Sequence, residues 1–121
     1  MALHTRSKGS LHEEEAARFL SNLGYKILKR NYRTRLGEID IIAEDRGIIC
    51  FIEVKSRSSR NFGLPEDAVN AVKQRHIAKV ALCYLKSQKK LDCNCRFDVV
   101  CIEVNQVEPI RVIKNAFDSP I

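Results

Sequence analysis

Two stretches rich in isoleucine and valine, residues 37–45 (GEIDIIAED) and 47–55 (GIICFIEVK), lie on either side of one short turn. β-Branched residues favour strands, and a glycine-containing turn between two such strands is typical of a β-hairpin. With Arg46 and Gly47 as the loop, the strands pair apolar with apolar on both faces: Ile39 with Val54, Ile41 with Ile52, Ile42 with Phe51 and Ala43 with Cys50. This register is tightly constrained, because a slip of one residue sends every side chain to the opposite face.

The same register places Asp40 directly opposite Glu53. Two carboxylates opposed across a strand pair repel each other, so a cation is expected between them. Lys55, on the same face as Glu53 and opposite Glu38, is one candidate, and a hard divalent cation such as Mg²⁺ is another. A ladder of structural salt bridges among these four residues is the alternative, and a bulged turn would place the two acids on opposite faces.

A third carboxylate comes from residues 10–23, which show the apolar period of a helix that Ser10 caps and Gly24 ends. Glu13 follows Ser10 by three residues, the spacing of a capping box. On the helical wheel Glu13 also shares an arc with three apolar residues, Ala16, Ala17 and Leu20. An acidic side chain at the end of a core-facing stripe needs a partner, so Glu13 is either a capping residue or part of the carboxylate site.

Three further strands and a second helix complete the pattern: strands over 25–33, 96–104 and 109–117, and a helix from Pro65 to about Lys86. Glu66 and Asp67 in the first turn suit the positive end of the helix dipole. Lys73 lies in the apolar stripe of this helix, where it either extends to solvent or reaches a phosphate. The basic stretch 56–65, between the hairpin and the helix, is predicted to be a mobile loop.

The size and charge of the chain limit the classes of protein to consider. At 121 residues it fits one α/β domain in the order α-β-β-β-α-β-β, with residues 1–8 predicted to be flexible. The 21 lysines and arginines exceed the 15 acidic residues and give a formal charge of +6, which favours a polyanionic partner such as nucleic acid. No stretch reaches the ~18 uninterrupted apolar residues that a membrane span needs.

The five cysteines are odd in number, and residues 1–10 contain no apolar signal segment. This pattern indicates free thiols in a reducing compartment, the cytoplasm. Cys93 and Cys95 have a C-x-C spacing, unlike the wider spacing of structural zinc sites. Cys50 and Cys101 lie in apolar runs, and we expect both in the core.

With Glu13, the G-E-I-D of 37–40 and the F-I-E-V-K of 51–55, the chain resembles the UPF0102 family, also called YraN-like. That family is similar to the PD-(D/E)-x-K nucleases, especially the archaeal Holliday-junction resolvases. The resemblance extends from about Gly9 to Phe117 and includes further segments: GYKILKRNYR at 24–33, FGLPEDAV at 62–69, Lys73, RFDVV at 96–100 and NAF at 115–117. It implies a restriction-endonuclease-like fold, a mixed β-sheet flanked by helices.

The resemblance also implies a metal-dependent endonuclease that hydrolyses phosphodiester bonds of DNA, including branched or junction DNA. The metal-binding acids of the superfamily match Asp40 and Glu53, its catalytic lysine matches Lys55, and its helical glutamate matches Glu13. Together with the carbonyl of Val54, these acids would hold Mg²⁺ or Mn²⁺.

Three basic residues are predicted to contact backbone phosphates: Arg57, Arg60 and Lys73. The resemblance favours DNA over RNA as the partner and implies a homodimer, because paired cleavage needs two sites. Two other classes of function remain open. One is a non-catalytic nucleic-acid-binding module on a nuclease scaffold, and the other is an interaction protein in which the acids and lysines form salt bridges.

Overall fold

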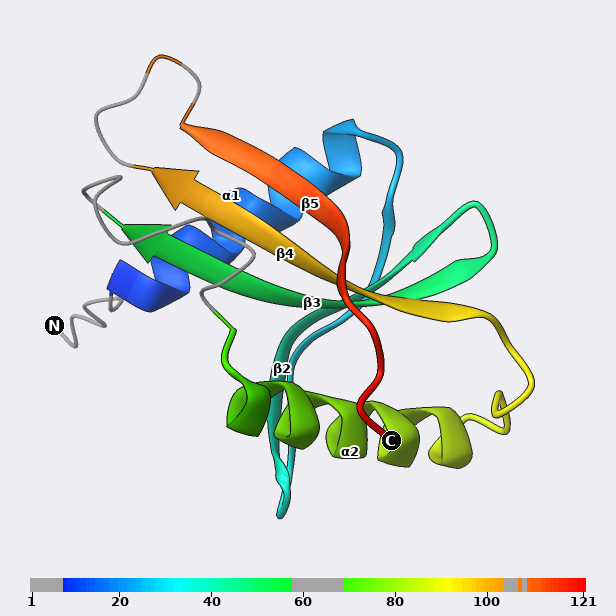
Figure 1. Cartoon of the computed structure of the whole chain (residues 1–121). Coiled ribbons are helices and arrows are strands. Elements are labelled where there is room, and N and C mark those ends of the chain that lie inside the picture. The colour runs from blue at the N-terminus through cyan, green and yellow to red at the C-terminus, as the bar shows by residue number, and fades with distance from the viewer. Residues whose placement is uncertain (1–7, 58–68, 104–106, 108) are drawn as a thin grey trace, which may run out of the picture.

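The computed structural model describes residues 8–57, 69–103, 107 and 109–121. In these residues two helices and five strands follow one another in the predicted order: α1 (Lys8–Asn22), β1 (Lys26–Thr34), β2 (Gly37–Asp45), β3 (Ile48–Arg57), α2 (Ala71–Ser87), β4 (Cys95–Glu103) and β5 (Ile110–Phe117) (Figure 1). The prediction of an α/β fold in the order α-β-β-β-α-β-β is therefore confirmed.

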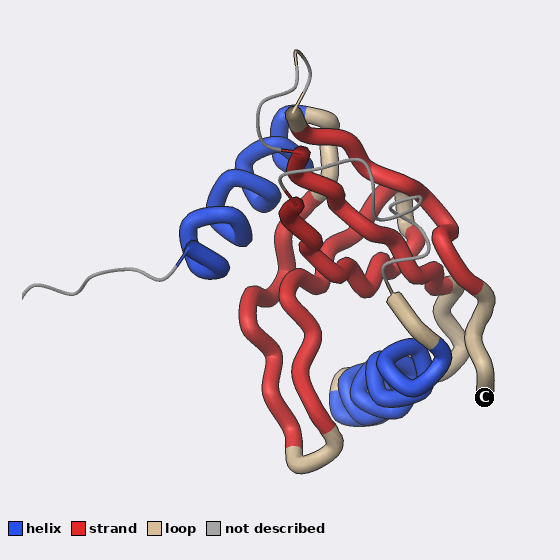
Figure 2. Tube along the Cα trace, turned by 60° about the vertical axis from the view of Figure 1, so that its left-hand side comes forward, coloured by secondary structure: helices blue, strands red, loops and turns tan. Residues whose placement is uncertain are grey.

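The five strands form one mixed sheet in chain order, β1-β2-β3-β4-β5. β3 and β4 are parallel, because the chain crosses over through α2 between them, and the other neighbours are antiparallel. The two helices lie on opposite sides of the sheet, as Figure 2 shows. Neither of these two described helices combines the length and apolar content that a transmembrane span requires.

Alternate residues of the central strands supply two separate cores. The core under α2 contains Phe51, Ile42, Phe97, Val80 and Tyr84, among others. The core under α1 contains Leu20, Ile41, Ile52, Val100 and the predicted core residue Cys50, among others. Strands β3 and β4 are thus buried on both faces, which explains why their sequences are nearly continuous apolar runs.

The hairpin register is confirmed near the turn: Ile41 pairs with Ile52, Ile42 with Phe51 and Ala43 with Cys50. Arg46 and Gly47 have positive φ angles of 51° and 85°, as a two-residue type I′ turn requires. Pairing of β2 with β3 ends at Ile41 and Ile52, so the expected continuation through Ile39 and Val54 is wrong.

The cause of this early end is a twist of both strands of the β1–β2 hairpin at Asp40 and Asn31. Asn31 has a positive φ of 53°, and the register places it opposite Asp40, between the pairs on either side. Beyond the twist Ile39 packs into the core under α2, whereas Ile41 packs under α1. The distal part of the hairpin therefore leaves the sheet as a two-stranded arm beside α2 (Figure 2).

Because of this twist, Glu38 does not lie opposite Lys55. It faces Arg33 of β1, with 3.0 Å between Arg33 Nε and Glu38 Oε2. The prediction that Lys55 lies opposite Glu38 is therefore wrong. Lys55 instead acts on Glu53, two residues before it on β3.

The start of each helix differs from the prediction, whereas the end of α1 agrees with it. α1 begins at Lys8, so Ser10 lies in its first turn rather than at the cap, while Gly24, with φ 99°, follows its end as predicted. α2 begins at Ala71 rather than Pro65, because the Asn70 side chain accepts a hydrogen bond from the Lys73 N–H at 2.9 Å.

Some predictions fall on residues that the structure does not describe. Residues 1–7 lie outside the described part of the chain, as do Pro65, Glu66, Asp67 and most of the predicted basic loop. Ser56 and Arg57, predicted to open that loop, belong to β3.

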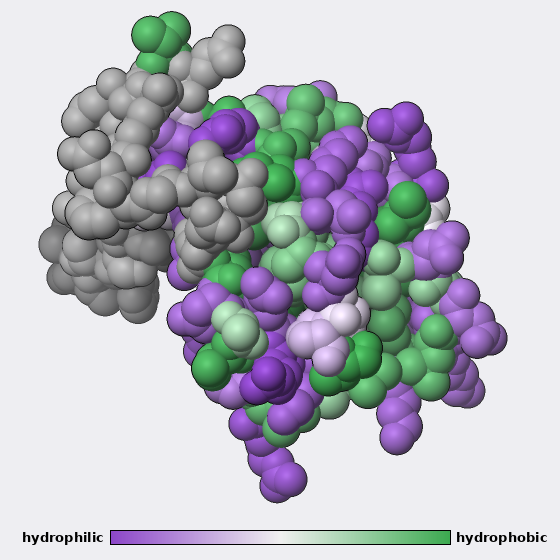
Figure 3. Space-filling view, viewed as in Figure 1, coloured by the Kyte–Doolittle hydropathy of each residue, from purple (hydrophilic) through white to green (hydrophobic). Residues whose placement is uncertain are grey.

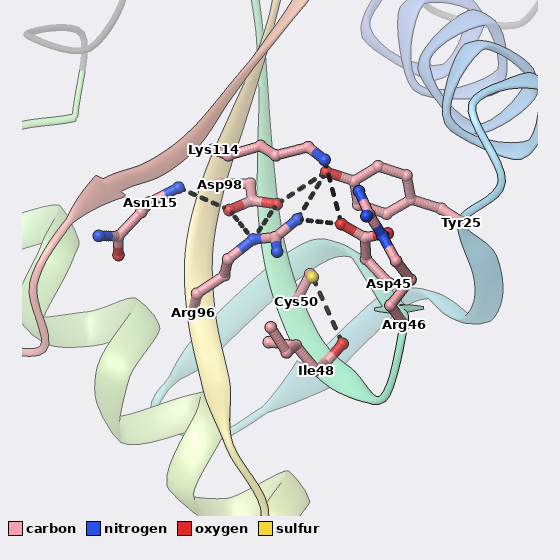
Figure 4. Close-up of polar contacts among 9 residues, drawn as sticks. All are labelled: Tyr25, Asp45, Arg46, Ile48, Cys50, Arg96, Asp98, Lys114 and Asn115. Atoms are coloured by element: carbon pink, nitrogen blue, oxygen red, sulfur yellow. Dashed lines mark hydrogen bonds and ion pairs between the residues drawn. The ribbon is translucent and has the colours of Figure 1, made fainter.

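A buried ion-pair network lies on the face of the sheet toward α1 (Figure 4). The fully buried Asp98 accepts hydrogen bonds from Arg96 Nε at 2.9 Å and from the Tyr25 hydroxyl at 3.1 Å. Arg96 also donates to Asp45 at 2.7 Å, and this bond, with the ammonium of Lys114, holds the pKa of Asp45 at about 2. The network connects four parts of the chain: the end of β2, the start of β4, strand β5 and the segment that follows α1.

Removing the Asp98 carboxylate should destabilise the fold strongly. Asp98→Ala removes one of the two carboxylates that bind the partly buried Arg96 guanidinium and leaves the Tyr25 hydroxyl without its acceptor, a change that costs about 3–5 kcal/mol of unfolding free energy. Urea denaturation followed by circular dichroism measures this loss. Asp118→Ala, at an exposed position, is the control and should change stability by less than about 0.5 kcal/mol. A comparably small effect of Asp98→Ala would show that the network does not support the fold.

Candidate functional site

The candidate site lies where β2 and β3 separate, which we call the strand fork. The first half of β3 pairs with both β2 and β4, but from Glu53 to Arg57 the register pairs it with β4 alone. Figure 1 shows β2 bending away from β3 toward the arm. Among the described strands, none pairs with the β2-facing edge of β3 from Glu53 onward, and the acids predicted from the hairpin lie at this point.

Asp40 takes the place of backbone pairing at the fork. Its Oδ2 accepts a hydrogen bond from the Val54 backbone N–H at 2.8 Å, where a regular ladder would offer the carbonyl of Ile39. The N–H and C=O of one strand residue project to the same side, so the Val54 carbonyl also faces the fork. The predicted ligand atoms of Asp40 and Val54 thus lie on the same side of β3.

Glu53 lies beside Asp40 and is only 7% exposed. Burial, a hydrogen bond from its carboxyl to Asp40 and the negative charge of Asp40 together raise the pKa of Glu53 to about 8. The ammonium groups of Lys73 and Lys55 act in the opposite direction. The two adjacent acids are therefore short of positive charge, as the sequence predicted for a site that takes a cation.

Glu13 approaches the same site from α1. It is partly buried, and its pKa is raised first by burial and then by the negative charge of Asp40. Arg30 and Arg33 of β1 oppose this rise. The structure thus brings the helical glutamate within electrostatic range of Asp40 and does not turn it toward bulk solvent.

Two lysines flank Glu53. Lys55 follows it by two residues on the same face of β3, and Lys73 reaches it from the first turn of α2, with 3.7 Å between Lys73 Nζ and Glu53 Oε2. The Lys73 side chain is 42% exposed, so its ammonium also reaches solvent. The sequence placed Lys73 near a phosphate but gave no sign that it pairs with Glu53.

The other predicted phosphate contacts do not join this cluster in the described residues. The Arg57 side chain is 14% exposed and forms an ion pair within the fold, with 3.8 Å between Arg57 Nη2 and Glu103 Oε1. Arg60 lies outside the described residues. The six predicted site residues that the structure brings together are Glu13, Asp40, Glu53, Val54, Lys55 and Lys73.

The donor set determines which metal fits. In the described part of the chain no three side chains of His, Cys, Asp or Glu gather closely enough to cage a metal ion. The fork instead offers two adjacent carboxylates, with Glu13 farther away. Mg²⁺ keeps several waters and binds one or two carboxylates together with substrate phosphates, whereas structural zinc needs four nitrogen or sulfur ligands. The residues present would therefore suit Mg²⁺, or the similar Mn²⁺, better than zinc.

The fold and the site define a small α/β protein with paired acids at a strand fork. The chain belongs to the family described as "Uncharacterised protein family UPF0102", whose model matches residues 12–102 and so includes all four residues of the predicted catalytic set. Over 118 residues it is 46% identical to the UPF0102 protein of Caldicellulosiruptor saccharolyticus, covering 95% of this chain and 100% of that relative. The UPF0102 protein of Geobacter metallireducens is 48% identical and covers 98% of both chains.

Among solved structures, SfsA from Pyrococcus furiosus in complex with Ca²⁺ is similar at 15% identity and a TM-score of 0.36. The match covers 88% of this chain and 60% of SfsA. A likeness this distant carries no argument about the present site.

Ionisation of Glu53 should cost stability as the pH rises. Its folded-state pKa of about 8 lies above the usual 4.5, so the unfolded chain loses this proton first. Stability contributed by the protonated acid is complete below about pH 4.5 and is lost as the pH rises toward about 8. Glu53→Gln should therefore lose less unfolding free energy than the wild type between about pH 5 and about pH 8, measured by urea denaturation in EDTA.

Glu15→Gln provides the control, because Glu15 is an exposed acid on α1. This variant should keep the pH dependence of the wild type. A Glu53→Gln variant with that same pH dependence would contradict the close packing of Glu53 against Asp40.

Proposed function

We propose that this protein is a metal-dependent endonuclease that hydrolyses phosphodiester bonds of DNA. The observation that carries the proposal is the pairing of Asp40 with the buried Glu53, held at a strand fork with a lysine on either side of Glu53. Membership of UPF0102 and the resemblance of its motifs to PD-(D/E)-x-K nucleases support the same reading. All five cysteines are free, which suits a reducing compartment such as the cytoplasm.

The acids of the fork would hold the metal. Asp40 is fixed by the Val54 N–H, which orients its carboxylate at the fork. Glu53 supplies a second carboxylate, and the Val54 carbonyl faces the same opening. Mg²⁺ bound there would polarise a phosphodiester oxygen and lower the pKa of a bound water. Glu13, on the α1 side, would accept a hydrogen bond from a water in this space.

The lysines would act on the phosphate. Lys55 lies next to Glu53 on an edge of β3 that β2 leaves open, so its ammonium is placed to orient the attacking water or to stabilise negative charge as the bond breaks. Lys73 pairs with Glu53, and its exposed ammonium would contact a neighbouring backbone phosphate.

A second candidate is a nucleic-acid-binding module that keeps this scaffold without catalysis. It is favoured by one observation, that no three acidic, histidine or cysteine side chains of the described residues form a ready metal cage. A catalytic site filled jointly by metal and substrate explains the same observation, because substrate phosphates complete the coordination of Mg²⁺. Turnover separates the two candidates.

Purified protein should cleave DNA in Mg²⁺ or Mn²⁺ and be inactive in EDTA. We expect activity in a screen of four-way, flapped, linear duplex and single-stranded DNA, and Asp40→Ala and Lys55→Ala should each lower the rate by about 10²-fold or more. Lys86→Ala, which removes an exposed lysine far along α2, is the charge-matched control for Lys55→Ala and should keep wild-type activity. Thermal melting would verify that each variant is folded.

Cleavage that survives both Asp40→Ala and Lys55→Ala would come from a contaminant and would end the proposal. DNA binding without cleavage of any substrate would favour the non-catalytic module.

A further inference from the structure

The edge strand β1 is strongly basic. Its nine residues include four cations and no acid, and a fifth cation follows at the hairpin turn: Lys26, Lys29, Arg30, Arg33 and Arg35. All five side chains are exposed. We call these five residues the basic edge. At about 3.3 Å per residue it extends over roughly 30 Å, the length of about nine base pairs of duplex DNA.

In the described residues the cations of this edge form fewer ion pairs than those of the other edge strand, although Lys26 lies opposite Glu44 in the β1–β2 register. On β5 both cations are bound to buried acids: Arg111 lies 2.9 Å from Glu103, and Lys114 lies 3.2 Å from Asp45. On the basic edge Arg33 alone has such a partner, the exposed Glu38, among the residues that the structure describes. Lysines on an edge strand also prevent sheets from pairing edge to edge, but β5 shows that this fold can carry edge cations with their charge neutralised.

The basic edge leads to the candidate site. In the β1–β2 register Asn31 lies opposite Asp40, so Arg30 stands directly beside the strand fork. Arg30 and Arg33 both act on the Glu13 carboxylate, whose pKa they lower. On the other side of the fork Lys73 approaches from α2. Cations therefore flank the paired acids from two elements.

The shape of the arm exposes this charge. The β1–β2 arm projects from the sheet beside α2 (Figure 2), and hydrophilic side chains lie at the bottom of the space-filling view (Figure 3). The end of the arm includes the exposed Leu36 of the turn. This end carries Arg35, in the two-residue turn between β1 and β2. A surface of this kind matches the negative charge of a phosphate backbone.

The described surface favours duplex over single-stranded nucleic acid. Proteins that bind single strands stack the bases on exposed aromatic side chains. In residues 8–57, 69–103, 107 and 109–121 the exposed large apolar side chains are all leucine, isoleucine or valine, with no phenylalanine or tyrosine among them. Cations alone suffice to hold the backbone of a duplex.

We propose that the basic edge is a phosphate-binding surface that holds the backbone of duplex DNA and leads it to the Asp40–Glu53 fork. The proposal rests on the proposed nuclease function and deepens it by naming the surface that binds the substrate. Binding through phosphates alone is independent of sequence and weakens as the salt concentration rises.

Fluorescence anisotropy of a labelled duplex of about 20 base pairs, titrated with the full chain in EDTA, tests this proposal. Lys29→Gln/Arg30→Gln should weaken binding about tenfold or more, and should make the slope of log K against log salt shallower by about 0.9 for each phosphate that the variant no longer neutralises. Lys79→Gln/Lys86→Gln removes the same charge from exposed positions on α2 and should bind nearly as the wild type does. The wild type should bind the matching single strand more weakly than the duplex.

Four results would overturn the proposal: no binding of duplex by the wild type, wild-type binding by the β1 double variant, an equal loss in both double variants, or single-strand binding as tight as duplex binding. Because no metal is present, the outcome is separate from cleavage. If the β1 variant binds as the wild type does, the basic edge is not the DNA-binding surface, but the proposed nuclease function is not contradicted. If the wild type binds duplex through this edge but never cleaves it, the proposed nuclease function is contradicted, but the proposed DNA-binding surface is not.

Discussion

The hydrogen bond from the Val54 N–H to the Asp40 carboxylate, at 2.8 Å, determines the form of this protein's site. A side-chain oxygen replaces the backbone carbonyl that would continue the β2–β3 ladder, so β2 separates from β3 without leaving that N–H unpaired. The same bond holds Asp40 against the buried Glu53. Three features depend on this replacement of a backbone hydrogen bond by a side-chain one: the fork, the projecting arm of β1 and β2, and the pairing of the two acids.

The rest of the fold keeps the fork rigid. β3 carries Glu53 and Lys55 and lies between two cores, while Asp98 and Arg96 tie the neighbouring strand to the start of β1 and to β5. A buried acid with a raised pKa next to another carboxylate does not favour stability. An unfavourable arrangement held by a rigid frame is typical of a functional site, where the missing positive charge is supplied by a ligand.

Much of the fold could be predicted because strong local signals fix it. The Arg46-Gly47 turn and the alternation of apolar residues determine the register near the turn, and the last observed pair, Ile41 with Ile52, directly precedes Asp40 and Glu53. Alternation cannot show that a side chain will take over a backbone bond, so the loss of the Ile39–Val54 pair was not predicted. The Asn70 cap was overlooked because Pro65 and the acids after it gave a stronger helix signal. The buried network depends on strand order, which residue patterns do not specify.

The location of a bound ion tests the central claim most directly. Crystals of the protein soaked in Mn²⁺ can be measured at a wavelength where manganese scatters anomalously. The account predicts an anomalous peak at the strand fork, bonded to carboxylate oxygens of both Asp40 and Glu53. A peak held by other carboxylates, or a fork that binds no manganese while its two acids remain side by side, would contradict it.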